Sequence, residues 1–393
     1  MSITAEVNRL TSLQADRLHA ELAEQCLQDE RLHSILPLLG MESSVISATT
    51  SETGTTGFPK PTDPIQEFRT IPFNFPDIGG HDISLESWEV EQVLDPKSFK
   101  NWVATVDYEP TYLLLVRSLR GIKKIVKWAE IVDKKVRVAG YRHTWAPLYS
   151  SPEDIIITFV PPALYQQLPY DDPPADFYSE LQGVSIVQSV DDTDTISSGI
   201  LAKVMAGTTN NQFRQWCYKN GSWALPFNTV VLAVTMGGTN ATICHGGGLS
   251  TCTLSDLVVE VCYVDAHGNE QRVFDPRELK AASVCFGLLG IVTSITLRME
   301  EMSIAEMRPT QVPIALAIPP PMDYSIPKVI QDQMLEANIS PDDLRRAKEE
   351  WIRRCEEDHF HEWFWFPFQK NAWVNTWKRE ASSLSNKLTT DLD

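Results

Sequence analysis

The sequence lacks the features that mark secreted, membrane-spanning and nucleic-acid-binding proteins. No segment approaches about 18 continuous apolar residues, so no membrane span is expected. The N-terminal segment MSITAEVNRLTSLQADRLHAEL has neither the apolar run of a signal peptide nor the Arg-rich, acid-free pattern of a transit peptide. These absences predict an intracellular, cytoplasmic protein.

Basic residues, cysteine clusters and common nucleotide motifs are scarce or missing as well. Lys and Arg number 34 against 52 Asp and Glu, which gives a net charge of −18, so nucleic acid is not an expected partner. The 7 cysteines form no CxxC pair, and we interpret them as reduced thiols. GxGxxG after a strand and GxxxxGKS/T are both absent, which argues against nicotinamide and P-loop nucleotide sites.

What is present indicates a globular chain, because 43% of the residues are hydrophobic and 22% are charged, and 393 residues are enough for two domains with their own cores. Leucines at helical spacing between Leu10 and Leu36 predict one or two amphipathic helices. Residues 41–85 are rich in Ser, Thr, Gly and Pro and are expected to form a linker or extended arm. Residues 1–87 are therefore interpreted as an N-terminal helical extension and linker.

Residues 88–305 alternate between strand and helix patterns. Ser118 is placed to cap a helix that is followed by the strand KKVRVAG, which gives a β-α-β unit. The segment AKVMAGTTNNQFRQWCYKNG predicts a second strand and helix. Residues 257–274 predict a hairpin, 278–286 a short helix and 291–299 an alternating strand, with which this domain closes.

Residues 306–393 predict only the beginning of another domain. The Pro-rich stretch 309–327 is expected to be a linker, and 341–355 a charged helix. HFHEWFWFPF and AWVNTW predict two strands of a sheet.

Two features of the aromatic strand leave alternatives open. His359, His361 and Glu362 suggest metal ligands, but the sequence places no complete ligand set, and no metal site is predicted. Trp363 and Trp365 either line a pocket or belong to the core of the sheet.

Three glycine-bearing segments carry the strongest chemical signal: RVAGYRHTWAPL (137–148), MGGTNATICHGGGLS (236–250) and FGLLGIVTSITL (286–297). Glycines let backbone N–H groups approach a diphosphate closely, and consecutive amides in a turn bind an anion without a lysine. The alternative is that each segment is an ordinary turn. Their order and spacing together favour a dinucleotide site.

These blocks resemble the vanillyl-alcohol-oxidase family of flavoproteins, with its p-cresol-methylhydroxylase (PCMH)-type FAD domain, and look most like sugar-lactone oxidases. The resemblance runs from about Glu109 to Met299 and includes EPTYLLLVRSLRGIKKIVKWAE, GSWALPFNTV and AASVCFGLLGIVTSITLRM. It implies an α+β fold in which a two-subdomain PCMH-type FAD-binding domain (88–305) is followed by an incomplete α+β substrate, or cap, domain (306–393). The C-terminal part of that cap domain is missing relative to the family.

The resemblance also implies a set of FAD-binding residues. His143 falls where many family members attach the flavin covalently to histidine; the alternative is that it caps or packs. Arg142 replaces the second glycine of the family motif, and its guanidinium is an alternative partner for a phosphate oxygen. His245 is as compatible with a structural role. The implied cofactor-binding residues are Gly140, Tyr141, Arg142, His143, Thr144, Gly237, Gly238, Thr239, Asn240, Thr242, His245, Gly246, Gly290, Ile291 and Val292.

The implied function is an FAD-linked oxidoreductase. An alcohol or other activated C–H of a small molecule, such as a sugar lactone or a secondary metabolite, passes a hydride to flavin N5, and dioxygen or another acceptor reoxidises the flavin. The catalytic base is not identified by the sequence. The alternatives are a flavin-binding protein without redox turnover and a flavin-dependent tailoring enzyme or cyclase of secondary metabolism.

Overall fold

A computed structural model gives the chain two units, Met1–Pro64 and Ile65–Asp393. The predicted N-terminal helices and most of the predicted linker lie outside the described residues. No helix in the described part of the chain is long and apolar enough to cross a membrane. The structure describes residues 69–76, 85–95, 98–165, 172–174, 176–188, 199–221, 223–227, 229–249, 253–321, 324–366 and 369–380.

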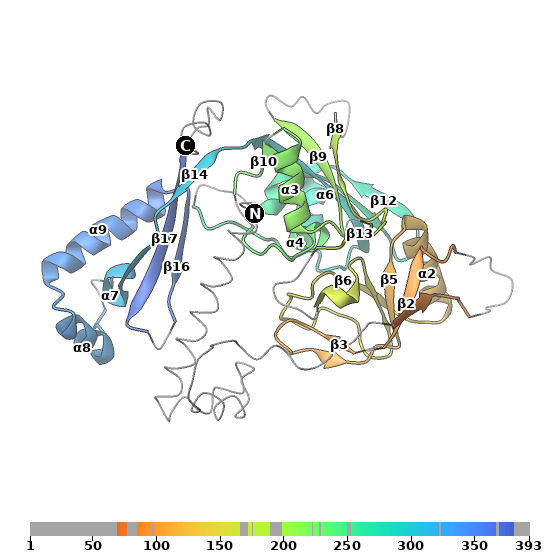
Figure 1. Ribbon diagram of the computed structural model, residues 1–393, viewed down its shortest axis with the longest axis horizontal. Helices are drawn as coiled ribbons and strands as arrows, with labels where there is room; N and C mark the ends of the chain where they lie inside the picture. The colour runs from red at the N-terminus through yellow and green to blue at the C-terminus, as the bar shows by residue number, and fades with distance from the viewer. Residues whose placement is uncertain are drawn as a thin grey trace, which may run out of the picture. The chain divides into compact units, whose positions relative to one another are not determined.

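A five-stranded mixed sheet in the order β1-β2-β5-β7-β6 opens the second unit (Figure 1). Its central strands are parallel, since β5 and β6 both pair with β7 in the same direction. Part of the segment predicted as a linker or extended arm forms the edge strand β1, which pairs antiparallel with β2. The strands are β1 (Arg69–Pro72), β2 (Val90–Asp95), β5 (Tyr112–Val116), β6 (Val136–Ala139) and β7 (Ile155–Thr158).

Helix α2 (Leu119–Ile131) covers this sheet and confirms the predicted β-α-β unit. The hydroxyl of Ser118 accepts a hydrogen bond from the N–H of Gly121, which satisfies one of the amides at the start of the helix. Ile122 and Ile125 are fully buried against the strands. A 3-10 turn, η4 (Pro162–Tyr165), follows β7, and a two-stranded hairpin, β3 (Phe99–Lys100) and β4 (Asp107–Tyr108), lies between β2 and β5 in the chain.

A second sheet has the order β12-β11-β13-β9-β8, with the short β10 added beside β13. The predicted alternating strand is β13, which is buried along most of its length because it lies between β11 and β9. The predicted hairpin is β11 and β12. The strands are β8 (Val184–Val187), β9 (Ile200–Met205), β10 (Trp223–Ala224), β11 (Val258–Val264), β12 (Glu270–Val273) and β13 (Ile291–Glu301).

Four helices accompany the second sheet. The predicted helix α3 begins with a capping box in which Thr209 and Gln212 satisfy one another's backbone N–H groups. Its apolar face buries Phe213 and Cys217 in the main hydrophobic core. The helices are α3 (Asn210–Lys219), α4 (Met236–Ala241), α5 (Leu254–Leu257) and α6 (Pro276–Ser283).

The last part of the chain forms the cap sheet, made of β14 (Ile304–Met307), β15 (Thr310–Pro313), β16 (Phe360–Phe364) and β17 (Asn371–Glu380). β14 and β15 follow one another along one edge of β17, and β16 pairs with its other edge. The predicted linker 309–327 is therefore wrong in part: its first residues form β15 and the short helix α7 (Ile314–Ala317).

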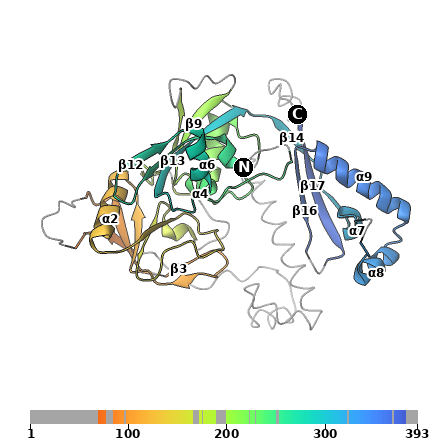
Figure 2. The ribbon, with the colours of Figure 1, turned by 180° about the vertical axis from the view of Figure 1, so that it is seen from behind.

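Helices α7, α8 (Lys328–Glu336) and α9 (Pro341–Glu357) lie on one side of the cap sheet (Figures 1 and 2). Residues of β17 alternate accordingly: Ala372 and Val374 are buried under the helices, whereas Trp373 is 42% exposed. The predicted charged helix is α9, capped by Ser340. The cap sheet thus has a covered face and an open face.

Candidate functional site

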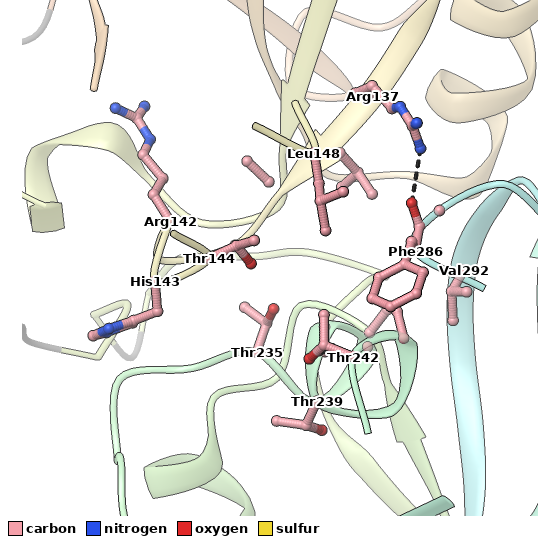
Figure 3. A pocket seen from close by; sticks show the side chains of 18 of the residues that line it. Arg137, Arg142, His143, Thr144, Leu148, Thr235, Thr239, Thr242, Phe286 and Val292 are labelled. Carbon is pink, nitrogen blue, oxygen red and sulfur yellow. Dashed lines mark hydrogen bonds between the residues drawn. The ribbon is translucent and has the colours of Figure 1, made fainter. Parts of the chain in front are cut away.

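A cavity of about 490 Å³ opens where the first and second sheets meet, and it collects residues from all three glycine-bearing segments (Figure 3). Of the 15 residues that the resemblance implied, 12 line this cavity. Its size is within the usual range of small-molecule sites. The 12 are Gly140, Tyr141, Arg142, His143, Thr144, Gly237, Gly238, Thr239, Thr242, Gly290, Ile291 and Val292.

The end of β6 and the start of α4 approach each other so closely that Gly140 cannot be replaced without movement. A Cβ atom on Gly140 would lie 2.3 Å from Oγ1 of Thr235, well inside van der Waals contact. Gly237 is held in a similar way, because its Cβ would lie 2.6 Å from the Cβ of Ala206. Both glycines therefore bring backbone to the wall of the cavity.

The segment after β6 is fastened by its carbonyl groups to the hairpin of β3 and β4. The N–H of Trp102 donates to the carbonyl of Arg142 at 2.9 Å, and Nδ2 of Asn101 donates to the carbonyl of Thr144 at 3.0 Å. The hydroxyl of Thr105 donates to the carbonyl of Trp145 at 3.0 Å. Tyr149 adds a further tie, since its hydroxyl donates to the carbonyl of Thr144 at 3.2 Å and also hydrogen bonds with the side chain of Thr144.

Arg142 takes the backbone conformation that glycine favours. Its φ is +61°, in the left-handed region that non-glycine residues rarely adopt. The guanidinium lies 4.4 Å from the centre of the Phe99 ring and donates to the carbonyl of Lys100 at 3.5 Å. Figure 3 shows this side chain leading away from the other labelled residues. The guanidinium thus packs on the Phe99 ring, while Arg142 also belongs to the cavity lining.

The imidazole of His143 lies at one end of the cavity (Figure 3). Its ring stacks on Trp102, with the ring centres 5.7 Å apart and the planes at 29°. Burial lowers the pKa of His143, and a hydrogen bond with the backbone of Ala233 opposes that shift only in part. The neutral imidazole is therefore favoured at neutral pH.

The second glycine segment divides between the cavity and its support. Thr239 and Thr242 line the cavity. Three predicted residues do not: Oδ1 of Asn240 accepts from Ser255, His245 is exposed and bridges to Thr253, and Gly246 packs on Phe227. These three hold the segment in place and do not contact the cavity.

The third segment closes the other end. Gly290 has φ +141°, and a Cβ there would lie 2.3 Å from the carbonyl oxygen of Val264. The predictions missed Arg137, whose Nη1 donates to the carbonyl of Phe286 at 2.9 Å across the cavity rim (Figure 3). Arg137 shares a strand face with Ala139 by period two, which was the one available signal. Lining residues outside the predicted set include Arg137, Leu148, Thr235 and Phe286.

The charge of the cavity wall contrasts with that of the chain. The described wall contains Arg137, Arg142 and His143 but no Asp or Glu, although the net charge is −18. The hydroxyl of Thr235 donates to no residue in the described part. Backbone amides and hydroxyls without acidic neighbours suit an anionic ligand such as a diphosphate.

The histidines of the cap sheet do not assemble with other ligands. Within the described residues, no three His, Cys, Asp or Glu side chains come together as a metal site. His361 lies on the covered face against Trp363, with ring centres 5.2 Å apart, while Glu362 points to the open face. The two tryptophans of this segment, which the sequence left open as pocket or core residues, differ. Trp363 packs beside Trp351 of α9, whereas Trp365 is 44% exposed.

No protein-family model and no curated protein matches the chain. Among solved structures it is similar to a point mutant of cholesterol oxidase from Brevibacterium sterolicum, with 17% identity and a TM-score of 0.48 over 79% of this chain and 50% of that one. Cholesterol oxidase from B. sterolicum itself (16%, 0.46, 74% and 48%) and a solvent-stable cholesterol oxidase (17%, 0.47, 73% and 48%) are similar to the same extent. The chain spans about half the length of these proteins, and a likeness at this level assigns neither cofactor nor substrate.

Proposed function

We propose that the cavity binds FAD and that the protein is an FAD-dependent oxidoreductase with the two-subdomain PCMH-type layout. The observation that carries the proposal is the convergence of three separated glycine segments on one wall, as the resemblance required. Nothing in composition or strand pattern alone forces residues near 140, 237 and 290 to meet.

The residues present fit a dinucleotide. Gly140 and Gly237 leave room at positions that a Cβ atom would fill, and the hydroxyl of Thr235 is a donor that no described residue uses. These groups would hold the diphosphate, with the acid-free wall adding no repulsion. His143 would lie at the flavin end and Phe286 at the adenine end, since they occupy opposite ends of the wall in Figure 3.

The chemistry that FAD supplies when bound is acceptance of a hydride from an alcohol or another activated C–H, with dioxygen or another acceptor restoring the oxidised form. The protein's part is to orient both partners and exclude water. The neutral imidazole of His143, stacked on Trp102, would form the covalent link that many members of the resembled family carry. Sugar lactones and secondary metabolites remain the predicted substrate classes.

The test is the absorbance at about 450 nm of the purified chain after incubation with FAD, before and after acid precipitation. Bound flavin gives a yellow protein, and a covalent link keeps the colour in the precipitate. The variant His143→Ala should still bind FAD but release it into the acid supernatant. A wild-type chain that stays colourless would contradict the proposed cofactor.

Turnover separates an oxidoreductase from a flavin-binding protein without redox activity. Oxygen uptake and dye reduction are measured with aldonolactones, alditols and aromatic alcohols, using His143→Ala and the flavin-free chain as controls. Flavin-loaded protein that reduces no acceptor with any of these substrates would leave FAD binding intact and remove the oxidoreductase assignment.

A further inference from the structure

A second cavity lies apart from the cofactor cavity, between the segment that leads into β8 and one side of α3. Its volume is about 390 Å³, which is within the usual range of small-molecule sites. No described residue lines both cavities. Three of the residues that line the second cavity are aromatic and one is acidic, namely Phe177, Tyr178, Trp216 and Asp176.

The three aromatic rings reach this cavity from two parts of the chain. Phe177 and Tyr178 precede β8, whereas Trp216 lies one turn after Gln212 on α3, and both helix residues line the cavity. Trp88 holds the ring of Tyr178 in a T-shaped contact, with ring centres 5.0 Å apart, yet Tyr178 is still 62% exposed. The faces of such rings carry negative charge density and attract a cation.

The second cavity carries a negative charge that no side chain compensates. The carboxylate of Asp176 forms no hydrogen bond or ion pair with any residue that the structure describes, and the described lining contains no Lys, Arg or His. Arg117 lies nearby, 5.6 Å from the centre of the Phe177 ring, but its guanidinium is paired with Glu91. A carboxylate beside three aromatic rings favours a cationic ligand and repels an anionic one.

The start of α3 does not oppose a cation, because another carboxylate already lies there. Asp172 accepts hydrogen bonds from the hydroxyl of Thr209 and, at 2.6 Å, from Nδ2 of Asn211. This carboxylate offsets the partial positive charge at the N-terminus of the helix. The carboxylate of Asp176 is therefore not needed by the helix and is left for a ligand.

The hydroxyl groups of the lining are engaged with backbone and leave few acceptors for a ligand. The hydroxyl of Thr208 donates to the carbonyl of Gly183 at 3.1 Å and accepts from its N–H at 2.9 Å. The hydroxyl of Ser179 donates to the carbonyl of Arg117 at 3.3 Å. A primary ammonium needs three acceptors, whereas a methylated ammonium presents its charge on apolar methyl groups that pack against rings.

We propose that the second cavity binds a small organic cation with a methylated ammonium group, held against Phe177, Tyr178 and Trp216 and paired with the carboxylate of Asp176. The inference goes beyond the proposed function and does not depend on it, because FAD and its chemistry concern the other cavity. A neutral ligand of the same shape would lose both the ion pair and the attraction to the ring faces.

Hydrogen bonds join the lining of the second cavity to the support of the cofactor cavity. Nε2 of Gln182 donates to the carbonyl of Phe159 at 3.3 Å, and Phe159 lines the cofactor cavity. The N–H of Met236, the first residue of α4, donates to the carbonyl of Thr208 at 2.9 Å. A cation in the second cavity would thus contact residues that support the cofactor cavity without entering it.

The experiment uses the full chain with isotope-labelled tryptophan and choline as the probe. The indole signal of Trp216, assigned by its loss in Trp216→Phe, should shift with saturation as choline is added. Dimethylbutanol, the neutral alcohol in which carbon replaces the quaternary nitrogen of choline, should bind at least about tenfold more weakly. Asp176→Asn keeps the size of the side chain and should weaken choline binding about threefold or more, because the ion pair is lost. Asp332→Asn, the same change at an exposed residue of α8, is the matched control.

A second pair of variants tests the rings. Tyr178→Leu removes an exposed ring and should weaken choline binding about threefold or more, whereas Tyr178→Phe keeps the ring and should bind choline as the wild type does. The proposal is overturned if the Trp216 signal does not respond to choline, if dimethylbutanol binds as tightly as choline, or if Asp176→Asn binds choline as Asp332→Asn does. Absorbance at about 450 nm on the same samples reports FAD separately, so either result can fail while the other holds.

Discussion

The cofactor cavity and the open face of the cap sheet are built from different parts of their residues. In the cavity, backbone does most of the lining: Gly140 and Gly237 bring main chain to the wall, and Arg142 adopts a glycine-like φ of +61°. On the open face of the cap sheet, the backbone N–H and C=O groups of β16 and β17 pair with each other. The groups left at the surface are the side chains of Glu362 and its aromatic neighbours. A backbone site suits a ligand shared by many proteins, whereas a side-chain site selects among substrates.

Gly140→Ala is expected to have the largest effect on the cavity, because Gly140 lies where two of its walls approach each other closely. The new methyl group would lie 2.3 Å from Oγ1 of Thr235, so the two walls must separate. We expect a loss of about 1–3 kcal/mol in the free energy of unfolding and at least roughly tenfold weaker FAD binding. Equilibrium urea unfolding and flavin absorbance measure the two effects.

The double variant Gly140→Ala/Thr235→Ala tests the cause. Removing Oγ1 and Cγ2 of Thr235 takes away the two nearest atoms, so part of the lost stability should return. If the double variant is as unstable as the sum of the single variants, the close approach of the two walls is not what Gly140 provides.

Much of the backbone architecture was predictable because its signals are local. Ser118 and Thr209 are N-cap residues, a signal that depends only on the next few residues, and helices α2 and α3 begin where expected. The resemblance added what periodicity does not contain, namely that residues near 140, 237 and 290 meet. β15 was missed because the proline-rich composition of its surroundings masks a strand that β17 pairs from more than 50 residues away.

The side-chain sites were less predictable, because they depend on register and tertiary contact. Arg137 reaches the carbonyl of Phe286 only after two sheets meet. The aromatic strand was visible in HFHEWFWFPF, yet its pattern does not state that Glu362 lies opposite Asn375. A one-residue slip would have moved Glu362 under the helices. The sequence thus identifies residue types, and the register decides which of them face a ligand.

Gly237 and Gly238, the adjacent glycines of α4, are expected to respond differently to substitution. A methyl group on Gly237 would meet the Cβ of Ala206 at 2.6 Å, whereas one on Gly238 meets only Oγ1 of Thr235 at 3.4 Å. Gly237→Ala should therefore lower the free energy of unfolding by about 1–3 kcal/mol. Gly238→Ala should raise it by up to about 1 kcal/mol through helix propensity. Thermal unfolding of both variants checks the opposite signs; equal effects would contradict the packing argument.

Trp102→Ala tests the side-chain component of the cavity. Its ring stacks on His143, and an aromatic pair contributes about 0.5–1.5 kcal/mol, so loss of the ring should lower the covalently retained share of flavin severalfold. Total flavin before acid treatment should change little, because the backbone donors are untouched. Trp102→Phe, which keeps a ring, should restore the share. A fall in total flavin in both variants would show instead that Trp102 supports the fold of the segment.

The smallest expected effects concern protonation, and they compare one group from each region. Burial lowers the pKa of His143 and raises that of Glu362, so the fold favours the neutral form of both. For His143 the unfolded chain binds more protons below its pKa of about 6.5, and stability falls as the pH drops through that value. For Glu362 the unfolded chain releases its proton first, at about pH 4.3, and stability falls as the pH rises from there through the higher folded pKa.

Glu362→Gln should consequently be slightly more stable than the wild type at pH 7, by a few tenths of a kcal/mol at most, since the side chain is partly exposed to solvent. The gain should disappear below about pH 4, where the carboxyl group is protonated in both states. Urea unfolding of wild type and Glu362→Gln at both pH values gives the difference directly, because other titrating groups cancel. An equal loss of stability at both pH values would mean that Glu362 serves the packing of the cap sheet, whereas the expected gain would mean that its ionised carboxylate is kept at a small cost to the fold.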